Sequence, residues 1–192
     1  MKIENSQLEL LQKAQEGDFE AFAELTEPFR KGACEFLSRL VDEDSAEDVF
    51  MKATLNAWRA LKSFSGKSSY KTWLFSIARY AALDELRNTK ARNEVSSDEE
   101  ESEAAVGRLE DERTPAPSQS LENEERNRMV EQALQQLPEM HRSVLVLYYY
   151  QDFHYTEIAE TLGISIGTVM SRLHHAKGKL EKALKPYQKD LV

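Results

Sequence analysis

The sequence predicts an all-α protein of two small helical domains, residues 1–90 and 127–192, joined by a flexible acidic linker over residues 91–126. In both outer segments apolar residues recur at the three- and four-residue spacing of a helix face. Neither shows the alternation of apolar and polar residues that is typical of half-buried strands. The middle segment has no apolar periodicity and is rich in charge, so it separates the two domains.

The first domain is predicted to be a helical bundle. Apolar residues keep helical spacing over Phe19–Leu40, where Pro28 is expected to begin or kink a helix. Asp42–Ser45 then marks a turn and a new N-terminus, and the next helix is predicted to run from Asp44 to about Leu61. Ser63–Ser69 is typical of a loop. Tyr70–Arg87 is apolar nearly all round in its first half, which predicts the buried central helix.

The linker accounts for the acidity of the chain. Between Asn93 and Arg126 there are twelve acidic and three basic residues, and this net charge of −9 equals that of all 192 residues. Such a composition buries too little apolar surface to fold alone. Its charge would repel DNA, and two interpretations stay open: a polyanion that fills a positively charged channel, or a solvated spacer.

The second domain contains the most informative pattern, Tyr155–His174, which predicts two short helices around a tight turn. Leu137-Pro138 marks an earlier helix boundary. Gly163 falls where the turn needs a positive φ. Ser165 is placed to cap the second helix. The two helices carry apolar stripes, formed by Ile158, Ala159 and Leu162 on the first and by Val169, Leu173, Ala176 and Leu180 on the second.

The second of these helices is predicted to read DNA. Its opposite face carries short polar and basic groups, namely Thr168, Ser171, Arg172, His175 and Lys179. A helix that packs on one side and shows such groups on the other is suited to a major groove. From Arg172 to Lys189 six residues are basic and only Glu181 is acidic. The alternative is an ordinary helical hairpin with a solvated face.

Several classes of protein are disfavoured. The chain has no Gly-rich phosphate loop and no nucleophile–base signature, so we expect neither an enzyme nor a bound cofactor. Adjacent His174 and His175 would point apart on a helix, so no metal is expected. Cys34 is the single cysteine, which excludes an internal disulfide. With no signal peptide and no long apolar run, we expect a cytoplasmic protein without membrane insertion.

These motifs resemble those of a known family. Three segments of the second domain resemble region 4 of bacterial sigma factors: Leu137–Leu145, Tyr155–Ala159 and Ser165–Arg172. Four segments of the first domain resemble sigma region 2: Asp44–Asp48, Ala57–Arg59, Lys71–Arg79 and Leu83–Arg87. With only these two regions and a linker, the chain is similar to the extracytoplasmic-function (ECF) group of the sigma-70 family.

The resemblance implies a function without covalent chemistry. Core RNA polymerase would be one partner and promoter DNA the other. Region 4 would read the −35 element as duplex, and region 2 would read the −10 element and help to open it. Many relatives are held inactive by an anti-sigma factor, so the resemblance also implies that class of partner.

The resemblance assigns −35 contacts to the recognition helix. They are Ser165, Gly167, Thr168, Ser171, Arg172, His174 and His175, with Lys177 and Lys179 as phosphate contacts. The small residues would let the helix N-terminus approach the phosphate backbone. Arg172 could take a guanine edge or a phosphate. His175 departs from the family, in which an arginine often lies nearby.

The −10 contacts are assigned to the loop before the central helix and to that helix itself. They are Lys67, Ser68, Ser69, Tyr70, Lys71, Arg79, Tyr80, Asp84 and Arg87. A melted base must be captured there to offset the cost of unstacking. Trp58 and Trp73 are interpreted as core residues, because both lie within apolar patterns. Asp84 could touch DNA or orient Arg87.

Polymerase docking is assigned to the outward face of the helix predicted from Asp44 to Leu61. That face carries Asp48, Met51, Lys52, Leu55, Asn56 and Arg59, whereas Phe50, Ala53, Ala57 and Leu61 point inward. Exposed apolar groups ringed by charge are typical of a partner surface. Family members usually carry Gln and Glu at Met51 and Lys52, so altered polar contacts are expected.

One alternative function stays open. The chain could be a helix-turn-helix regulator that never joins polymerase, with its first domain serving as a sensor or a dimerisation module. A sensor should offer a ligand cavity or a symmetric face, whereas the first domain resembles sigma region 2.

Overall fold

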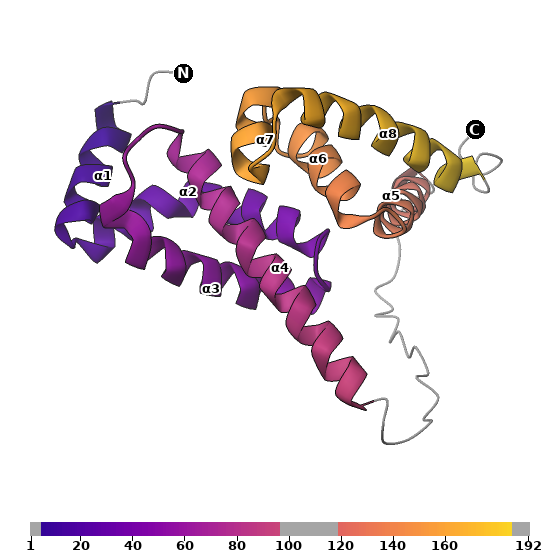
Figure 1. Cartoon of the computed structure of the whole chain (residues 1–192), viewed down its shortest axis with the longest axis horizontal. Helices are drawn as coiled ribbons and strands as arrows, with labels where there is room; N and C mark the ends of the chain where they lie inside the picture. The colour runs from indigo at the N-terminus through magenta and orange to yellow at the C-terminus, as the bar shows by residue number, and fades with distance from the viewer. Residues whose placement is uncertain (1–4, 97–118, 186–192) are drawn as a thin grey trace.

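The computed structural model describes residues 5–96 and 119–185, and within them every regular element is a helix (Figure 1). This confirms the predicted all-α class. The elements, in chain order, are α1 (Asn5–Glu16), α2 (Phe19–Ser38), α3 (Glu43–Ala60), the 3-10 turn η1 (Leu61–Ser63), α4 (Tyr70–Ser96), α5 (Gln119–Gln135), α6 (Glu139–Tyr149), α7 (Tyr155–Leu162) and α8 (Ile166–Leu184).

Helices α1–α4 form the N-terminal lobe. Asp18 begins α2, because its carboxylate accepts a hydrogen bond from the Ala21 N–H at 3.0 Å. Pro28 lies inside α2 and does not begin it. The predicted inward face of α3 is buried, with Ala53 and Ala57 fully covered. The first half of α4 is the buried centre of the lobe, as its composition predicts.

Helix α4 passes its predicted end at Arg87 and continues to Ser96, and α5 begins at Gln119 inside the predicted linker. The residues after Arg87 include Lys, Ala, Arg and Glu, which have high helix propensity despite lacking an apolar stripe. Extending an existing helix needs no new nucleus, so propensity suffices here. The rest of the predicted linker, residues 97–118, lies outside the described residues.

Helices α5–α8 form the C-terminal lobe, and α7 and α8 form the predicted helix-turn-helix. Gly163 ends α7 in the left-handed conformation with φ of 64°, where a side chain would be strained. The Ile164 N–H then donates to the Ala159 carbonyl at 3.0 Å. Both predicted apolar stripes are buried, except that Leu180 is only half-buried.

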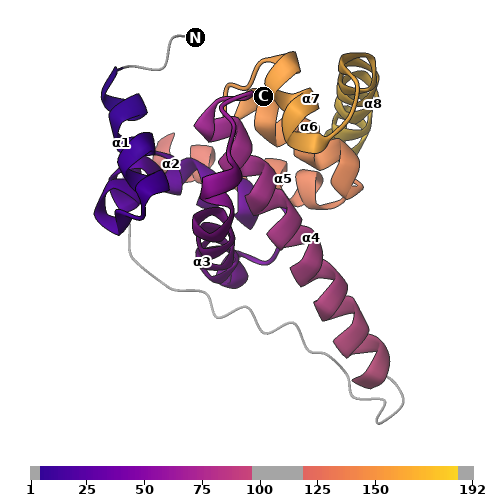
Figure 2. The ribbon, with the colours of Figure 1, turned by 60° about the vertical axis from the view of Figure 1, so that its left-hand side comes forward.

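The two lobes pack directly against each other. The sequence predicts two domains joined by a flexible linker, and that prediction did not include a contact between them. A single buried cluster includes Phe36 and Phe75 from the N-terminal lobe and Phe153 and Ile158 from the C-terminal lobe. The ring centroid of Phe75 lies 5.7 Å from that of Phe36 and 5.1 Å from that of Phe153. Figures 1 and 2 both place α7 beside the first half of α4. We call this packing the interlobe contact.

Candidate nucleic-acid and polymerase interfaces

The recognition helix α8 presents its predicted DNA-facing side chains to solvent. Ser165 caps the helix, because its hydroxyl accepts the Thr168 N–H at 3.1 Å. The backbone N–H groups of the first turn lie beside exposed Gly167, where no side chain blocks a phosphate. The other members of the predicted set follow along the helix: Ser171, His174, His175, Lys177 and Lys179 are exposed, and Thr168 and Arg172 are half-buried.

Positive charge gathers on this face of α8. Burial lowers the pKa of His141, and the nearby positive groups Lys179, His175 and Arg172 lower that pKa further. The side chain of Tyr149, whose ring centroid lies 5.8 Å from Lys177 Nζ, raises the pKa of Lys177. The face is therefore electropositive, as binding to a phosphate backbone requires.

The Ser165 cap gives a testable effect on stability. Ser165→Ala removes the acceptor for the Thr168 N–H, so we expect the free energy of unfolding to fall by about 1 kcal/mol. In a chain of this length the melting temperature should fall by roughly 2–4 °C, as measured by circular dichroism. Ser171→Ala, in the interior of the same helix, is the control and should leave the melting temperature unchanged or slightly raised.

Four of the nine residues in the predicted −10 set are exposed on the N-terminal lobe. Lys67 and half-exposed Ser68 lie in the loop before α4. Tyr80 is 59% exposed, which leaves its ring available to stack on a base. An Arg87 guanidinium nitrogen lies 3.4 Å from the Asp84 carboxylate, and both side chains are exposed. This pair fits the interpretation in which Asp84 orients Arg87.

Tyr70 needs correction as a −10 residue. Its side chain is 7% exposed, and its hydroxyl forms a 2.7 Å hydrogen bond with the Thr26 hydroxyl. Phe64 and Trp73 pack against its ring, and burial raises the pKa of Tyr70 to about 12. The ring therefore belongs to the core and cannot stack on a base. Ser69 caps α4 instead of facing a ligand, because its hydroxyl accepts the Thr72 N–H at 3.0 Å.

Lys71 and Arg79 point into the interlobe contact. The Lys71 ammonium donates to the Gln151 carbonyl at 2.7 Å and lies 4.4 Å from the centroid of the Phe153 ring. Burial lowers the pKa of Lys71. Arg79 Nε lies 3.3 Å from Glu139 Oε1, and the Arg79 side chain is only 12% exposed. In this arrangement neither cation is free to hold a phosphate.

The predicted docking face lies on the outside of α3. Met51 is 67% exposed and Leu55 is 52% exposed, so two large apolar side chains face solvent one helical turn apart. Asp48, Asn56 and Arg59 are exposed around them. Lys52 Nζ lies 2.7 Å from a carboxylate oxygen of Glu85. Trp58 and Trp73 pack in the core, as interpreted from their apolar surroundings.

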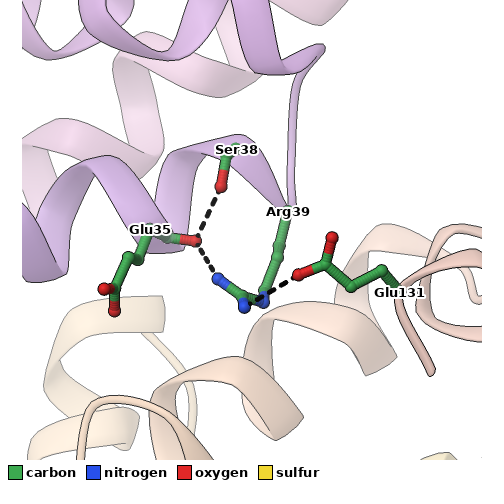
Figure 3. Close-up of polar contacts among 4 residues, drawn as sticks. All are labelled: Glu35, Ser38, Arg39 and Glu131. Atoms are coloured by element: carbon green, nitrogen blue, oxygen red, sulfur yellow. Dashed lines mark hydrogen bonds and ion pairs between the residues drawn. The ribbon is translucent and has the colours of Figure 1, made fainter. Parts of the chain in front are cut away.

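The residues of the interlobe contact were missed from the sequence. Arg39 joins the lobes at one edge: it donates to the Glu35 carbonyl at 2.8 Å and pairs with Glu131 at 3.0 Å (Figure 3). Its guanidinium also lies 4.2 Å from the centroid of the Tyr150 ring. The one available signal was Gly32, a helix-disfavouring glycine inside an apolar helical pattern, which often marks close packing.

In residues 5–96 and 119–185, none of the helices combines the length and the apolar character needed to cross a lipid bilayer. Nor do three or more His, Cys, Asp or Glu side chains in these ranges converge as they would around a metal ion.

Comparison with known families gives two matches, one for each lobe. The family described as "Sigma-70 region 2" matches residues 27–92, and the family described as "Sigma-70, region 4" matches residues 127–180. Together these matches cover most of the chain in the order that the sequence motifs predict.

Two curated relatives match nearly the whole chain. The RNA polymerase sigma-H factor of Pseudomonas aeruginosa is 31% identical over 190 residues, which cover 97% of each chain. The ECF RNA polymerase sigma-E factor of Escherichia coli K12 is 31% identical over 181 residues, which cover 92% of this chain and 93% of the relative.

Two solved structures share the fold. One is the sigma factor RpoE in complex with the anti-sigma factor NepR from Bartonella quintana, with a TM-score of 0.66 and 24% identity over 85% of this chain and 96% of that one. The other is CnrH in complex with the cytosolic domain of CnrY, with a TM-score of 0.69 and 22% identity over 95% of this chain and 99% of that one.

Proposed function

This chain belongs to the ECF group of the sigma-70 family, and on that premise we propose that its two lobes divide promoter recognition between them. As a sigma factor it directs transcription initiation and is not an enzyme. In the proposal residues 127–192 read the −35 element, residues 1–90 read the −10 element and hold polymerase, and residues 91–126 link them.

The −35 reader is the exposed face of α8. It consists of Ser165, Gly167, Thr168, Ser171, Arg172, His174, His175, Lys177 and Lys179. The helix N-terminus would hold a phosphate with its free N–H groups, and the lysines would hold others. Arg172 would lie in the major groove. The single observation that supports this assignment best is a capped recognition helix whose exposed face is electropositive.

The −10 reader is the loop before α4 together with one face of α4. We retain Lys67, Ser68, Lys71, Arg79, Tyr80, Asp84 and Arg87 in this proposal and omit buried Tyr70 and the helix-capping Ser69. Tyr80 supplies the aromatic surface on which a melted base can stack. The cations supply phosphate contacts.

Core RNA polymerase is the proposed partner of the α3 face. Met51 and Leu55 would be the apolar anchors, and Asp48, Lys52, Asn56 and Arg59 would form a polar rim. Because polymerase works in the cytoplasm, we place the protein there. An anti-sigma factor is a further proposed partner, as in the solved complex of RpoE with NepR.

In vitro transcription tests the function directly. The purified chain is added to core polymerase on a library of randomised promoters, and the transcripts are sequenced. We expect start sites enriched for two upstream elements, about 10 and 35 base pairs from the start. Core polymerase alone and the chain alone are the controls. Transcripts without start-site selection would refute the proposal and favour the regulator alternative, which the region 2 match disfavours.

A further inference from the structure

Two large apolar side chains face solvent on the recognition helix. Ile166 is 45% exposed and Met170 is 55% exposed. They lie four positions apart in the first half of α8, so they are neighbours on one side of the helix. Among the described residues, neither belongs to a buried core cluster or to the half-buried side chains that pack against one. The packing of the fold therefore does not account for them.

The pair lies inside the proposed −35 reader, although the sequence motifs did not assign either residue to it. On the helix surface Met170 is next to Gly167, three positions before it, and to His174, four positions after it. Both of these neighbours are exposed members of the reader. In a helix-turn-helix the N-terminal residues of the recognition helix contact the base edges. Ile166 and Met170 occupy that part of α8, so duplex DNA is the partner that would cover them.

These two side chains can discriminate between bases only by apolar contact. Isoleucine has no hydrogen-bonding group, and the methionine thioether is only a weak acceptor. The apolar group at the base edges of the major groove is the 5-methyl group of thymine. A polar base edge covered by either side chain would lose its hydrogen bonds to water without gaining others. A thymine methyl group would instead leave water, which strengthens binding about fourfold for each methyl group buried.

We propose that Ile166 and Met170 are specificity residues of the −35 reader and that they contact thymine methyl groups in the major groove. This inference rests on the proposed function, because it requires α8 to read the −35 element. It predicts at least one A·T pair, with thymine on either strand, beneath these two side chains. Met170 is the more exposed of the two and its unbranched side chain adapts to the position of a methyl group, so we expect it to contribute more.

Deoxyuridine tests the contact one methyl group at a time. Uracil pairs with adenine as thymine does but lacks the 5-methyl group. The library of randomised promoters first gives the −35 element that the holoenzyme, the chain bound to core polymerase, selects. Each thymine of that element is then replaced by deoxyuridine, singly and all together, in a promoter duplex that is otherwise unchanged. The dissociation constant of the holoenzyme for each duplex is measured by competition with a fluorescent promoter.

Alanine variants of the two residues complete a double-mutant cycle between protein and DNA. The wild-type holoenzyme should bind the fully substituted duplex at least about fourfold more weakly than the thymine duplex. The double variant, Ile166→Ala with Met170→Ala, should bind the two duplexes equally, because no large side chain remains to contact the methyl group. Alanine keeps α8 helical, so both substitutions should preserve the fold.

The experiment has one control in the protein and one in the DNA. Met140→Ala changes a methionine that is 45% exposed on α6, outside the reader, and should keep the full deoxyuridine effect. Deoxyuridine placed in the spacer between the −10 and −35 elements should leave the affinity of the wild-type holoenzyme unchanged.

The outcomes separate the proposal from its alternatives. A deoxyuridine effect that disappears in the double variant and stays in Met140→Ala supports it. Equal binding of wild type to both duplexes, an effect that persists in the double variant, or a selected −35 element of G·C pairs alone overturns it. Loss of affinity for core polymerase in the double variant, with the deoxyuridine effect intact, would place the two side chains in a protein interface and overturns it as well.

Failure of the proposed function is recognised at an earlier step. If the holoenzyme selects no −35 element from the library, the proposed function fails before any deoxyuridine is introduced, and this inference fails with it. Absence of the deoxyuridine effect on a selected element overturns this inference alone and leaves the proposed function standing.

Discussion

Replacing both Met51 and Leu55 with aspartate is expected to weaken binding to core RNA polymerase by at least about a hundredfold. The two side chains are 67% and 52% exposed on α3 with charged and polar residues around them, which is the anatomy of an interface centre. Truncating a residue that is a hot spot of an interface costs about 2 kcal/mol or more of binding free energy, and we expect Met51 and Leu55 to act as such residues. The two introduced aspartate carboxylates would be buried at the interface without partners, which adds a further unfavourable free energy of binding. The dissociation constant for fluorescently labelled core polymerase is the measurement.

The control for this prediction is Leu8→Asp, which makes the same chemical change at a leucine that is 43% exposed on α1. Leu55→Asp should weaken polymerase binding while Leu8→Asp should not. Both variants should keep the helical circular dichroism of wild type, since neither side chain is buried. Wild-type affinity in the Met51 and Leu55 double variant would show that polymerase docks elsewhere.

Local features of the fold could be predicted from the sequence because their causes are local. Gly163 ends α7 with a positive φ and Ser165 caps α8, and each role depends on residues within one helical turn. The inward face of α3 follows in the same way from the spacing of its apolar residues. The same reasoning predicted the solvent-facing side of α8, where seven residues of the −35 set are exposed and Thr168 and Arg172 are half-buried.

Long-range contacts could not be predicted, because no local pattern encodes them. Lys71 reaches the Gln151 carbonyl across 80 positions of sequence. Tyr70 follows a polar loop and looked available to DNA, yet its hydroxyl bonds Thr26 from a different helix. The partners of these side chains depend on how the helices pack, which the spacing of residues along the chain does not show. In the packed structure two of the predicted DNA-contacting residues, Lys71 and Arg79, instead contact the C-terminal lobe.

Arg172→Ala is expected to lower transcription from promoters that depend on a −35 element by about ten- to a hundredfold. Arg172 is half-buried on the electropositive face of α8, among the other proposed −35 contacts. Loss of a base-reading arginine typically costs about 1–3 kcal/mol. Polymerase binding should be unchanged, because the proposed docking face lies on α3. Transcript yield and polymerase affinity are measured on the same preparations.

Two companion variants separate the possible roles of Arg172. Lys182→Ala removes one positive charge from an exposed position in the last turn of α8, outside the proposed reader, and should change transcription little. Arg172→Lys keeps the charge but loses the guanidinium fork. If Arg172 reads a guanine edge, lysine should restore little activity, whereas a phosphate contact would be largely restored. Loss of polymerase affinity in Arg172→Ala would contradict the assigned role, since it would place the residue in the wrong interface.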